Sequence, residues 1–102
     1  MSSVVHVVLV EWGAETPDDV KEAARESAQG FRTRIDGVLS VVEGPSTSPE
    51  NLENGFDYGL VITFADAAAR DAYLPHPVHR VLADLIGEHS ARVIVYDIES
   101  GE

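Results

Sequence analysis

The segment from Tyr73 to His79 gathers the side chains of this chain that are best suited to proton transfer. It reads Tyr-Leu-Pro-His-Pro-Val-His, so one phenol and two imidazoles, those of His76 and His79, lie within seven residues. Histidine titrates close to neutral pH, and a tyrosine hydroxyl donates a hydrogen bond to a carbonyl oxygen. Together these groups suit the removal of a proton from a carbon atom next to a carbonyl group.

Two prolines decide whether the phenol and the second imidazole can meet. Six residues along an unbroken helix correspond to a rotation of roughly 240°, which would point Tyr73 and His79 to different sides. Pro75 and Pro77 interrupt the helix, and this break lets the two side chains converge. We therefore predict a helix that ends near Tyr73, a second helix that begins near His76, and a hollow that these two side chains share.

The segments around this region alternate between strand and helix patterns. Alternating or continuous apolar, β-branched residues predict strands, and apolar residues at every third or fourth position predict helices. The expected order is a strand over 4–12, a helix over 16–37 capped by Thr16, strands over 38–43 and 58–64, helices over 66–73 and 76–87, and a strand over 93–98. This is the order of the ferredoxin-like split βαβ arrangement, an α+β fold in which helices cover one face of a four-stranded antiparallel sheet.

The first strand is apolar on both faces, so both faces must be covered. Along it, Val5, Val7 and Leu9 point to one side, and His6, Val8, Val10 and Trp12 point to the other. The helices cover one face of the sheet. We expect a second copy of the chain to cover the open face, which gives a homodimer and a dimeric α+β barrel.

Length and composition restrict the class of protein further. The 102 residues, 44% hydrophobic and 25% charged, predict one globular domain over 1–102. No apolar run approaches the ~20 residues that cross a bilayer, and the N-terminal residues carry no signal-peptide pattern, so we expect a cytoplasmic protein without membrane contact. A formal net charge of −11 repels phosphate backbones, which argues against nucleic acid as a partner. The absence of cysteine excludes thiolate nucleophiles and zinc–thiolate sites.

Several motifs together resemble the stress-responsive dimeric A/B barrel family. They are HVVLVEW at 6–12, Asp36-Gly37, Gly44, Asn54-Gly55-Phe56-Asp57, VITF at 61–64, AYLPHPVH at 72–79 and VIVYDIE at 93–99. The Tyr-x-x-His-Pro-x-His run is the most specific of them and is similar to the corresponding run of a plant polyketide cyclase in this family. The resemblance spans nearly the whole chain and implies the same dimeric barrel.

For single residues, the resemblance implies a catalytic pair. His79 would take a proton from a methylene flanked by carbonyls, and Tyr73 would hydrogen-bond the carbonyl oxygen as it becomes an enolate. The carbon would then attack a distant carbonyl of the same molecule in an aldol or Claisen-type cyclisation. This chemistry requires no metal and no organic cofactor, and its substrate is a small hydrophobic compound that carries carbonyl groups.

The resemblance and the strand pattern also suggest which residues form the wall of the cavity. We expect substrate-binding roles for His6, Val8, Val10, Ala24, Ala28, Leu60, Ile62 and His76. Ala24 and Ala28 stand where the cyclase carries aromatic pocket residues, so the cavity should have a different shape and substrate identity does not transfer. Tyr58 replaces a histidine of the cyclase, which changes either the polar lining or a structural hydrogen bond.

Each of these residues also has a structural interpretation. His76 can cap the second helix, and His6 can be a buried histidine satisfied by a hydrogen bond. His76 and His79 alone lack the third and fourth ligands that zinc takes, so no metal site is expected. Three functions therefore stay open: a cyclase-like enzyme, a non-catalytic stress-responsive or ligand-binding dimer, and a cofactor-free monooxygenase.

Overall fold

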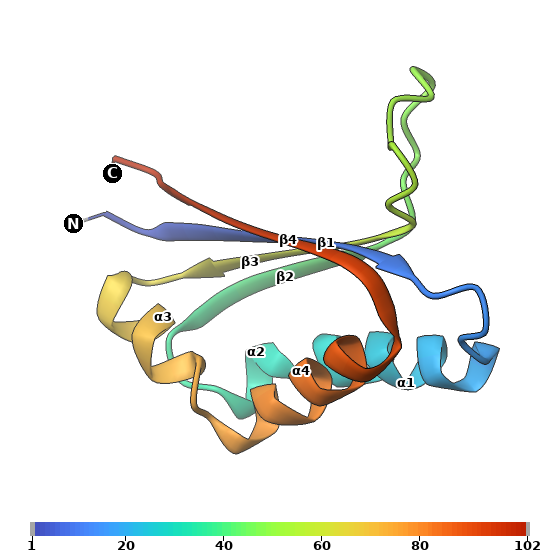
Figure 1. Cartoon of the computed structure of the whole chain (residues 1–102). Coiled ribbons are helices and arrows are strands. Elements are labelled where there is room, and N and C mark those ends of the chain that lie inside the picture. The colour runs from blue at the N-terminus through green and yellow to red at the C-terminus, as the bar shows by residue number, and fades with distance from the viewer. Residues whose placement is uncertain (1, 102) are drawn as a thin grey trace.

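The elements of the computed structural model, which describes residues 2–101, follow the predicted order (Figure 1). They are β1 (Val4–Trp12), α1 (Asp18–Gln29), α2 (Phe31–Arg34), β2 (Val38–Gly44), β3 (Tyr58–Phe64), α3 (Ala67–Tyr73), α4 (Pro77–His89) and β4 (Ser90–Glu99). All strand pairs are antiparallel, the strand order is β2-β3-β1-β4, and the helices lie on one face of the sheet. The predicted ferredoxin-like arrangement is confirmed.

The helix expected over 16–37 is shorter than predicted and is divided. α1 stops at Gln29, Gly30 takes the turn, and only one further turn follows as α2. Glycine is a poor helix former, and here its N–H bonds the carbonyl of Ser27 in a tightened last turn. Thr16 does not cap α1, because its hydroxyl donates to the carbonyl of His89 at the end of α4. That bond fixes the start of α1 beside the end of α4.

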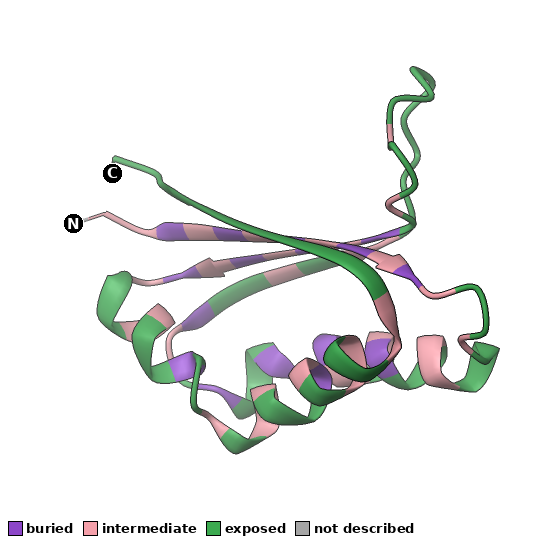
Figure 2. Ribbon diagram, in the orientation of Figure 1, coloured by how far each residue is buried: buried purple, intermediate pink, exposed green. Residues whose placement is uncertain are grey.

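Alternation along the two central strands places the core between the sheet and the helices (Figure 2). Val10, Leu60 and Ile62 are fully buried there, as are Ala24 and Ala28 on the inner side of α1. These two positions leave no room for a larger side chain between α1 and the sheet, so alanine suits the close packing of the two layers. Burying a Val, Leu or Ile side chain contributes about 1.5–3 kcal/mol, so these positions hold the layers together.

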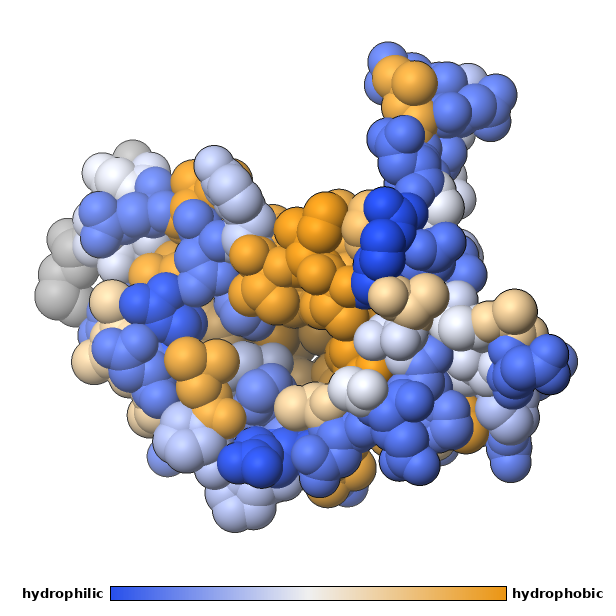
Figure 3. Space-filling model, in the orientation of Figure 1, coloured by the Kyte–Doolittle hydropathy of each residue, from blue (hydrophilic) through white to orange (hydrophobic). Residues whose placement is uncertain are grey.

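The opposite side of the sheet, here called the open face, exposes large apolar side chains. Val42 and Tyr96 are 67% and 64% exposed, and Ile94 and Ile98 are also exposed. The register places Ile94, Tyr96 and Ile98 opposite Leu9, Val7 and Val5, so all six lie on the same side of the sheet. The space-filling view shows an apolar band over β4, with a hollow between this band and the helix layer (Figure 3).

Residues 45–57, here called the arm, connect β2 to β3 and project from the sheet on the side away from the helices (Figure 1). Arg92 on β4 holds the base of the arm. Its Nε lies 2.6 Å from a carboxylate oxygen of Glu11, and its guanidinium carbon lies 4.4 Å from the centre of the Phe56 ring. Across residues 2–101, no helix combines the length and apolar composition that spanning a membrane requires.

Candidate functional site

A cavity of about 280 Å³ lies between the sheet and the helices α3 and α4. It is lined by His6, Val8, Leu60, Tyr73, Leu74, His79, Leu82, Ala83, Ile86, Gly87, Val93 and Val95. Most of this lining is apolar, and its titratable groups are two imidazoles and one phenol. An apolar pocket with a few convergent polar groups is the usual form of a small-molecule site.

The chain breaks between α3 and α4 as the two prolines predict. α3 ends at Tyr73, and the N–H of His76 donates to the Tyr73 carbonyl over 3.0 Å. His76 then caps α4, because its Nδ1 accepts the N–H of Val78 over 3.0 Å while Pro77 occupies the first helical position. His76 is not among the residues that line the cavity. These contacts therefore favour the structural role of His76, which is to cap α4.

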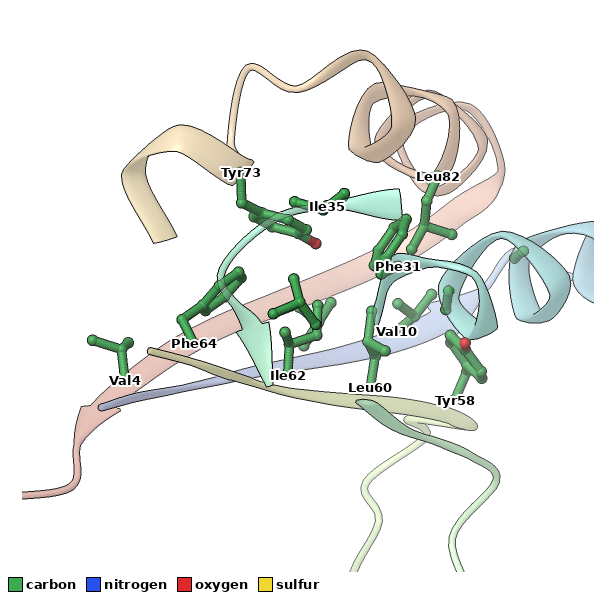
Figure 4. Packing of buried hydrophobic residues seen from close by; sticks show 14 of the residues in the cluster. Val4, Val10, Phe31, Ile35, Tyr58, Leu60, Ile62, Phe64, Tyr73 and Leu82 are labelled. Atoms are coloured by element: carbon green, nitrogen blue, oxygen red, sulfur yellow. The ribbon is translucent and has the colours of Figure 1, made fainter. Parts of the chain in front are cut away.

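The break brings Tyr73 and His79 together on the cavity wall. Their ring centres lie 4.0 Å apart with an angle of 33° between the ring planes. Tyr73 is 1% exposed and also contacts the rings of Phe31, Phe64 and His6, with centre distances of 5.6, 4.9 and 5.6 Å. Figure 4 shows Tyr73 reaching from the helix layer toward Phe64, which projects from the sheet. These contacts fix the direction of the phenol.

The hydrogen bond of His79 determines which ring nitrogen is free. Nδ1 of His79 lies 2.9 Å from the carbonyl oxygen of Leu74. A carbonyl oxygen only accepts, so Nδ1 carries the proton and Nε2 keeps its lone pair. Burial is the main cause that lowers the pKa of His79 below its ordinary value, against the opposing effect of the Leu74 carbonyl. His79 is therefore a neutral base at pH 7.

The Tyr73 hydroxyl has the complementary property of a donor. Burial, with a smaller contribution from the charge of Asp97, raises its pKa above the ordinary value, so it stays protonated at neutral pH. Among residues 2–101, no group forms a hydrogen bond with this hydroxyl. It is consequently available to a carbonyl oxygen of a guest molecule in the cavity.

The third polar group of the wall, His6, is held from behind by two residues that sequence reasoning missed. Its Nδ1 lies 2.6 Å from Oδ1 of Asp97, and Nη1 of Arg70 lies 2.5 Å from Oδ2 of the same carboxylate. Partial burial acts to raise the pKa of Asp97, but the hydrogen bonds from Arg70 and His6 outweigh it and hold that pKa below its ordinary value. Within the described part of the chain, no three His, Asp or Glu side chains form a group that could hold a metal ion.

The cavity brings together about half of the predicted site residues. His6, Val8, Leu60, Tyr73 and His79 line it. The other predicted wall residues lie elsewhere: Val10, Ala24, Ala28 and Ile62 are in the core, and His76 caps α4. The cavity instead takes much of its wall from the inner side of α4 and from β4. The apolar residues at helical spacing in 76–87 indicated that α4 has an inner side, but the sequence did not predict that this side lies over β4.

A larger hollow, of about 700 Å³, lies between the open face and the arm. Its lining includes Leu9, Val61 and Ile94 from the sheet together with Leu52 and Phe56 from the arm. It contains no imidazole, and it lies on the other side of the sheet from Tyr73 and His79. Size alone therefore does not make it the candidate catalytic cavity.

Comparison with known proteins places this chain in a family. Residues 4–100 match the stress-responsive A/B barrel domain. No protein with a curated description matches the chain.

Solved structures similar to this chain include a dimeric ferredoxin-like protein of unknown function from Jannaschia sp. CCS1, 26% identical with a TM-score of 0.85, over 94% of this chain and 97% of that one. A protein from Arabidopsis thaliana is 25% identical with a TM-score of 0.80, over 97% and 96%. The hydroxynitrile lyase of Passiflora edulis is 15% identical with a TM-score of 0.87, over 98% and 94%, a likeness of fold alone. Since the family match extends over nearly all of the sequence, the chain belongs to the stress-responsive A/B barrel domain family.

Proposed function

We propose that this protein binds a small hydrophobic compound with carbonyl groups and cyclises it, in the manner of a cofactor-independent polyketide cyclase. The observation that carries the proposal is the pair of Tyr73 and His79, whose rings lie 4.0 Å apart on the wall of an apolar cavity. One member of the pair is a neutral base with a free Nε2, and the other is a protonated donor without a partner among residues 2–101. A base beside a hydrogen-bond donor is the combination that enolate formation requires.

The proposed reaction begins with proton transfer. Nε2 of His79 removes a proton from a methylene that two carbonyls flank, and the electron pair of the C–H bond moves onto a carbonyl oxygen. The Tyr73 hydroxyl donates a hydrogen bond to this oxygen and stabilises the enolate as its charge develops. Because the wall of the site is largely apolar, the hydrogen bond is stronger there than in solvent.

The second step forms a carbon–carbon bond within the same molecule. The enolate carbon attacks a distant carbonyl carbon, whose π electrons move to its oxygen. In an aldol closure, the protonated His79 returns its proton to this alkoxide; in a Claisen-type closure, the alkoxide re-forms a carbonyl and the proton goes to the leaving group. Holding the flexible chain bent in a confined cavity supplies much of the rate enhancement.

The quaternary structure in this proposal is a homodimer formed through the open face. Monomeric proteins rarely expose a continuous apolar patch of the kind that Val42, Ile94, Tyr96 and Ile98 contribute to. Two sheets that pack face to face at ~10 Å would cover it. The partner would also fill the hollow beside the arm, which leaves the cavity of Tyr73 on the outer side of each sheet.

Two substitutions test the catalytic proposal. We expect His79→Ala and Tyr73→Phe to fold and to lose turnover of a linear poly-β-keto substrate, measured by chromatography of the cyclised product. His89→Ala is the matched control, because it removes an imidazole that does not line the cavity. Inactivity of the wild-type protein across a broad panel of such substrates would contradict the proposal.

A second candidate function is a non-catalytic ligand-binding dimer. The observation that favours it is that both histidines of the broken helix make structural bonds, His76 to the N–H of Val78 and His79 to the carbonyl of Leu74. Because the bond to the Leu74 carbonyl is present under either function, His79→Ala should lower the free energy of unfolding by ~1–3 kcal/mol in both cases. The two functions are separated by the wild-type protein: a cyclase converts a linear poly-β-keto compound to a cyclic product, whereas a non-catalytic dimer binds it and releases it unchanged.

A further inference from the structure

Arg70 lies outside the cavity, yet it is bonded to the cavity wall through Asp97. Its Nη1 lies 2.5 Å from Oδ2 of Asp97, whose Oδ1 lies 2.6 Å from Nδ1 of His6. We propose that Arg70 is a positioning residue of the site, which fixes Asp97 so that His6 keeps one tautomer and turns its Nε2 lone pair to the cavity. The functional meaning of this arrangement rests on the proposed role of the cavity, but the arrangement itself can be tested without a substrate.

The tautomer of His6 follows from its partner. An ionised carboxylate can only accept hydrogen bonds, so the proton between His6 and Asp97 belongs to Nδ1 of the imidazole. In the neutral imidazole, Nε2 is then the nitrogen with a lone pair. His6 is 3% exposed, so its ring cannot exchange this hydrogen bond for one to bulk water without a cost in free energy. The orientation of the ring therefore depends on a fixed position of the carboxylate.

Asp97 needs such fixing because of its place in the fold. It lies on the edge strand β4, which within residues 2–101 pairs only with β1, and its side chain is 26% exposed. An exposed carboxylate on an edge strand can rotate toward water. Arg70, on helix α3, bonds the second carboxylate oxygen of Asp97 and thereby fixes the direction of the carboxylate relative to that helix.

Helix α3 also carries Tyr73, three residues after Arg70, so both residues lie on the same side of that helix. The ion pair with Asp97 docks this side of α3 on the sheet, and Tyr73 then lies against the His6 ring at a centre distance of 5.6 Å. One short helix thus positions the phenol directly and the first imidazole indirectly.

The arrangement makes a prediction about the guest. Nδ1 of His79 is bonded to the Leu74 carbonyl, as Nδ1 of His6 is bonded to Asp97, so both imidazoles have the same tautomer. The wall then presents two Nε2 acceptors and one phenolic donor. A compound that supplies a carbonyl oxygen to Tyr73 and a hydroxyl or acidic C–H to the imidazoles matches this set, which an enolisable β-dicarbonyl compound does.

Imidazole ¹H–¹⁵N NMR of the full chain at neutral pH tests the proposal. In the wild type we expect His6 as a single Nδ1–H tautomer. Arg70→Met keeps the aliphatic stem but removes the guanidinium, so the Nδ1 proton of His6 should exchange with water at least about tenfold faster, which corresponds to ~1.4 kcal/mol. Arg70→Lys should restore most of the protection. Arg32→Met is the matched control, because Arg32 is exposed on α2 and forms no ion pair within residues 2–101.

A wild-type exchange rate and tautomer in Arg70→Met would overturn the proposal, since Asp97 alone would then suffice to hold His6. If Arg70→Met does not fold, the same criterion applies to Arg70→Gln, which keeps a donor but has no charge: faster exchange supports the role of Arg70, and the wild-type rate refutes it. Because this readout needs no turnover, a lack of cyclase activity would refute the proposed function and leave the positioning role to be decided by the spectra.

Discussion

Removal of the Tyr73 hydroxyl should leave the fold unchanged, whereas removal of its ring should not. The hydroxyl forms no hydrogen bond with another group of residues 2–101, so we expect Tyr73→Phe to change the free energy of unfolding by less than about 0.5 kcal/mol. Tyr73→Ala deletes a buried ring in contact with four others and leaves a space that the layers cannot close. That substitution should cost ~3–5 kcal/mol.

Urea unfolding followed by Trp12 fluorescence measures both effects. Trp12 is the one tryptophan of the sequence, it is buried, and it stacks on Tyr58 at a centre distance of 6.0 Å, so its emission reports on the sheet and core. With a slope of ~2 kcal/mol per molar urea, a loss of ~4 kcal/mol lowers the midpoint by about 2 M. Protein concentration is kept equal because dimer stability depends on it.

The result that would refute this reasoning is a large loss in Tyr73→Phe. A decrease above ~2 kcal/mol would mean that the hydroxyl satisfies a buried structural partner. The phenol would then not be available to a guest, and its role as a donor to an enolate oxygen would be wrong. A near-neutral Tyr73→Phe together with a costly Tyr73→Ala would support a ring that packs and a hydroxyl that is free for function.

Three further predictions concern pH, assembly and backbone. Burial lowers the pKa of His79 below 6.5 in the folded protein, so the unfolded chain binds this proton more tightly. The stability contributed by neutral His79 should therefore be complete above pH 6.5 and decline as the pH falls below it. In urea unfolding measured as a function of pH, His79→Gln should make the free energy of unfolding less dependent on pH below 6.5. Tyr96→Asp places a charge on the open face and should shift the sedimentation coefficient to that of a monomer. Val81→Asp places the same charge at an exposed position of α4, away from the open face, and should leave the sedimentation coefficient unchanged. Gly37→Ala should lower the free energy of unfolding by more than ~1 kcal/mol, measured by thermal unfolding, because Gly37 has φ +87° and an added Cβ would lie 2.5 Å from a side chain of α3. Gly87→Ala is the control: its added Cβ would meet nothing within 4 Å, so this substitution should be neutral or stabilising.

The strands and the broken helix could be predicted because their signals are local. The alternation over 58–64 and the apolar run over 4–12 each specify a strand without reference to the rest of the chain. Pro75 and Pro77 determine where α3 ends and α4 begins, and this break is what brings Tyr73 to His79. The division of the first helix at Gly30 was not predicted, because the apolar spacing continues through it to Phe31 and Ile35.

The site could be predicted only in part, because the remainder depends on contacts that are distant in sequence. Asp97 meets His6 through the register of β1 with β4, and Arg70 meets Asp97 through the docking of α3. The pairs are separated by 91 and 27 residues. Likewise, periodicity marks Ala24 and Ala28 as inward-facing, but it does not predict which helix lies over the cavity. In the structure that helix is α4.

The most direct test of the central claim is a structure of the protein with a bound probe, for which an aryl β-diketone is suitable. We predict that the probe occupies the cavity between β4 and α4, with its enolisable carbon within about 3.5 Å of Nε2 of His79 and one carbonyl oxygen within hydrogen-bond distance of the Tyr73 hydroxyl. A cavity that stays closed to the probe, or a probe that binds only in the hollow beside the arm, would contradict the account.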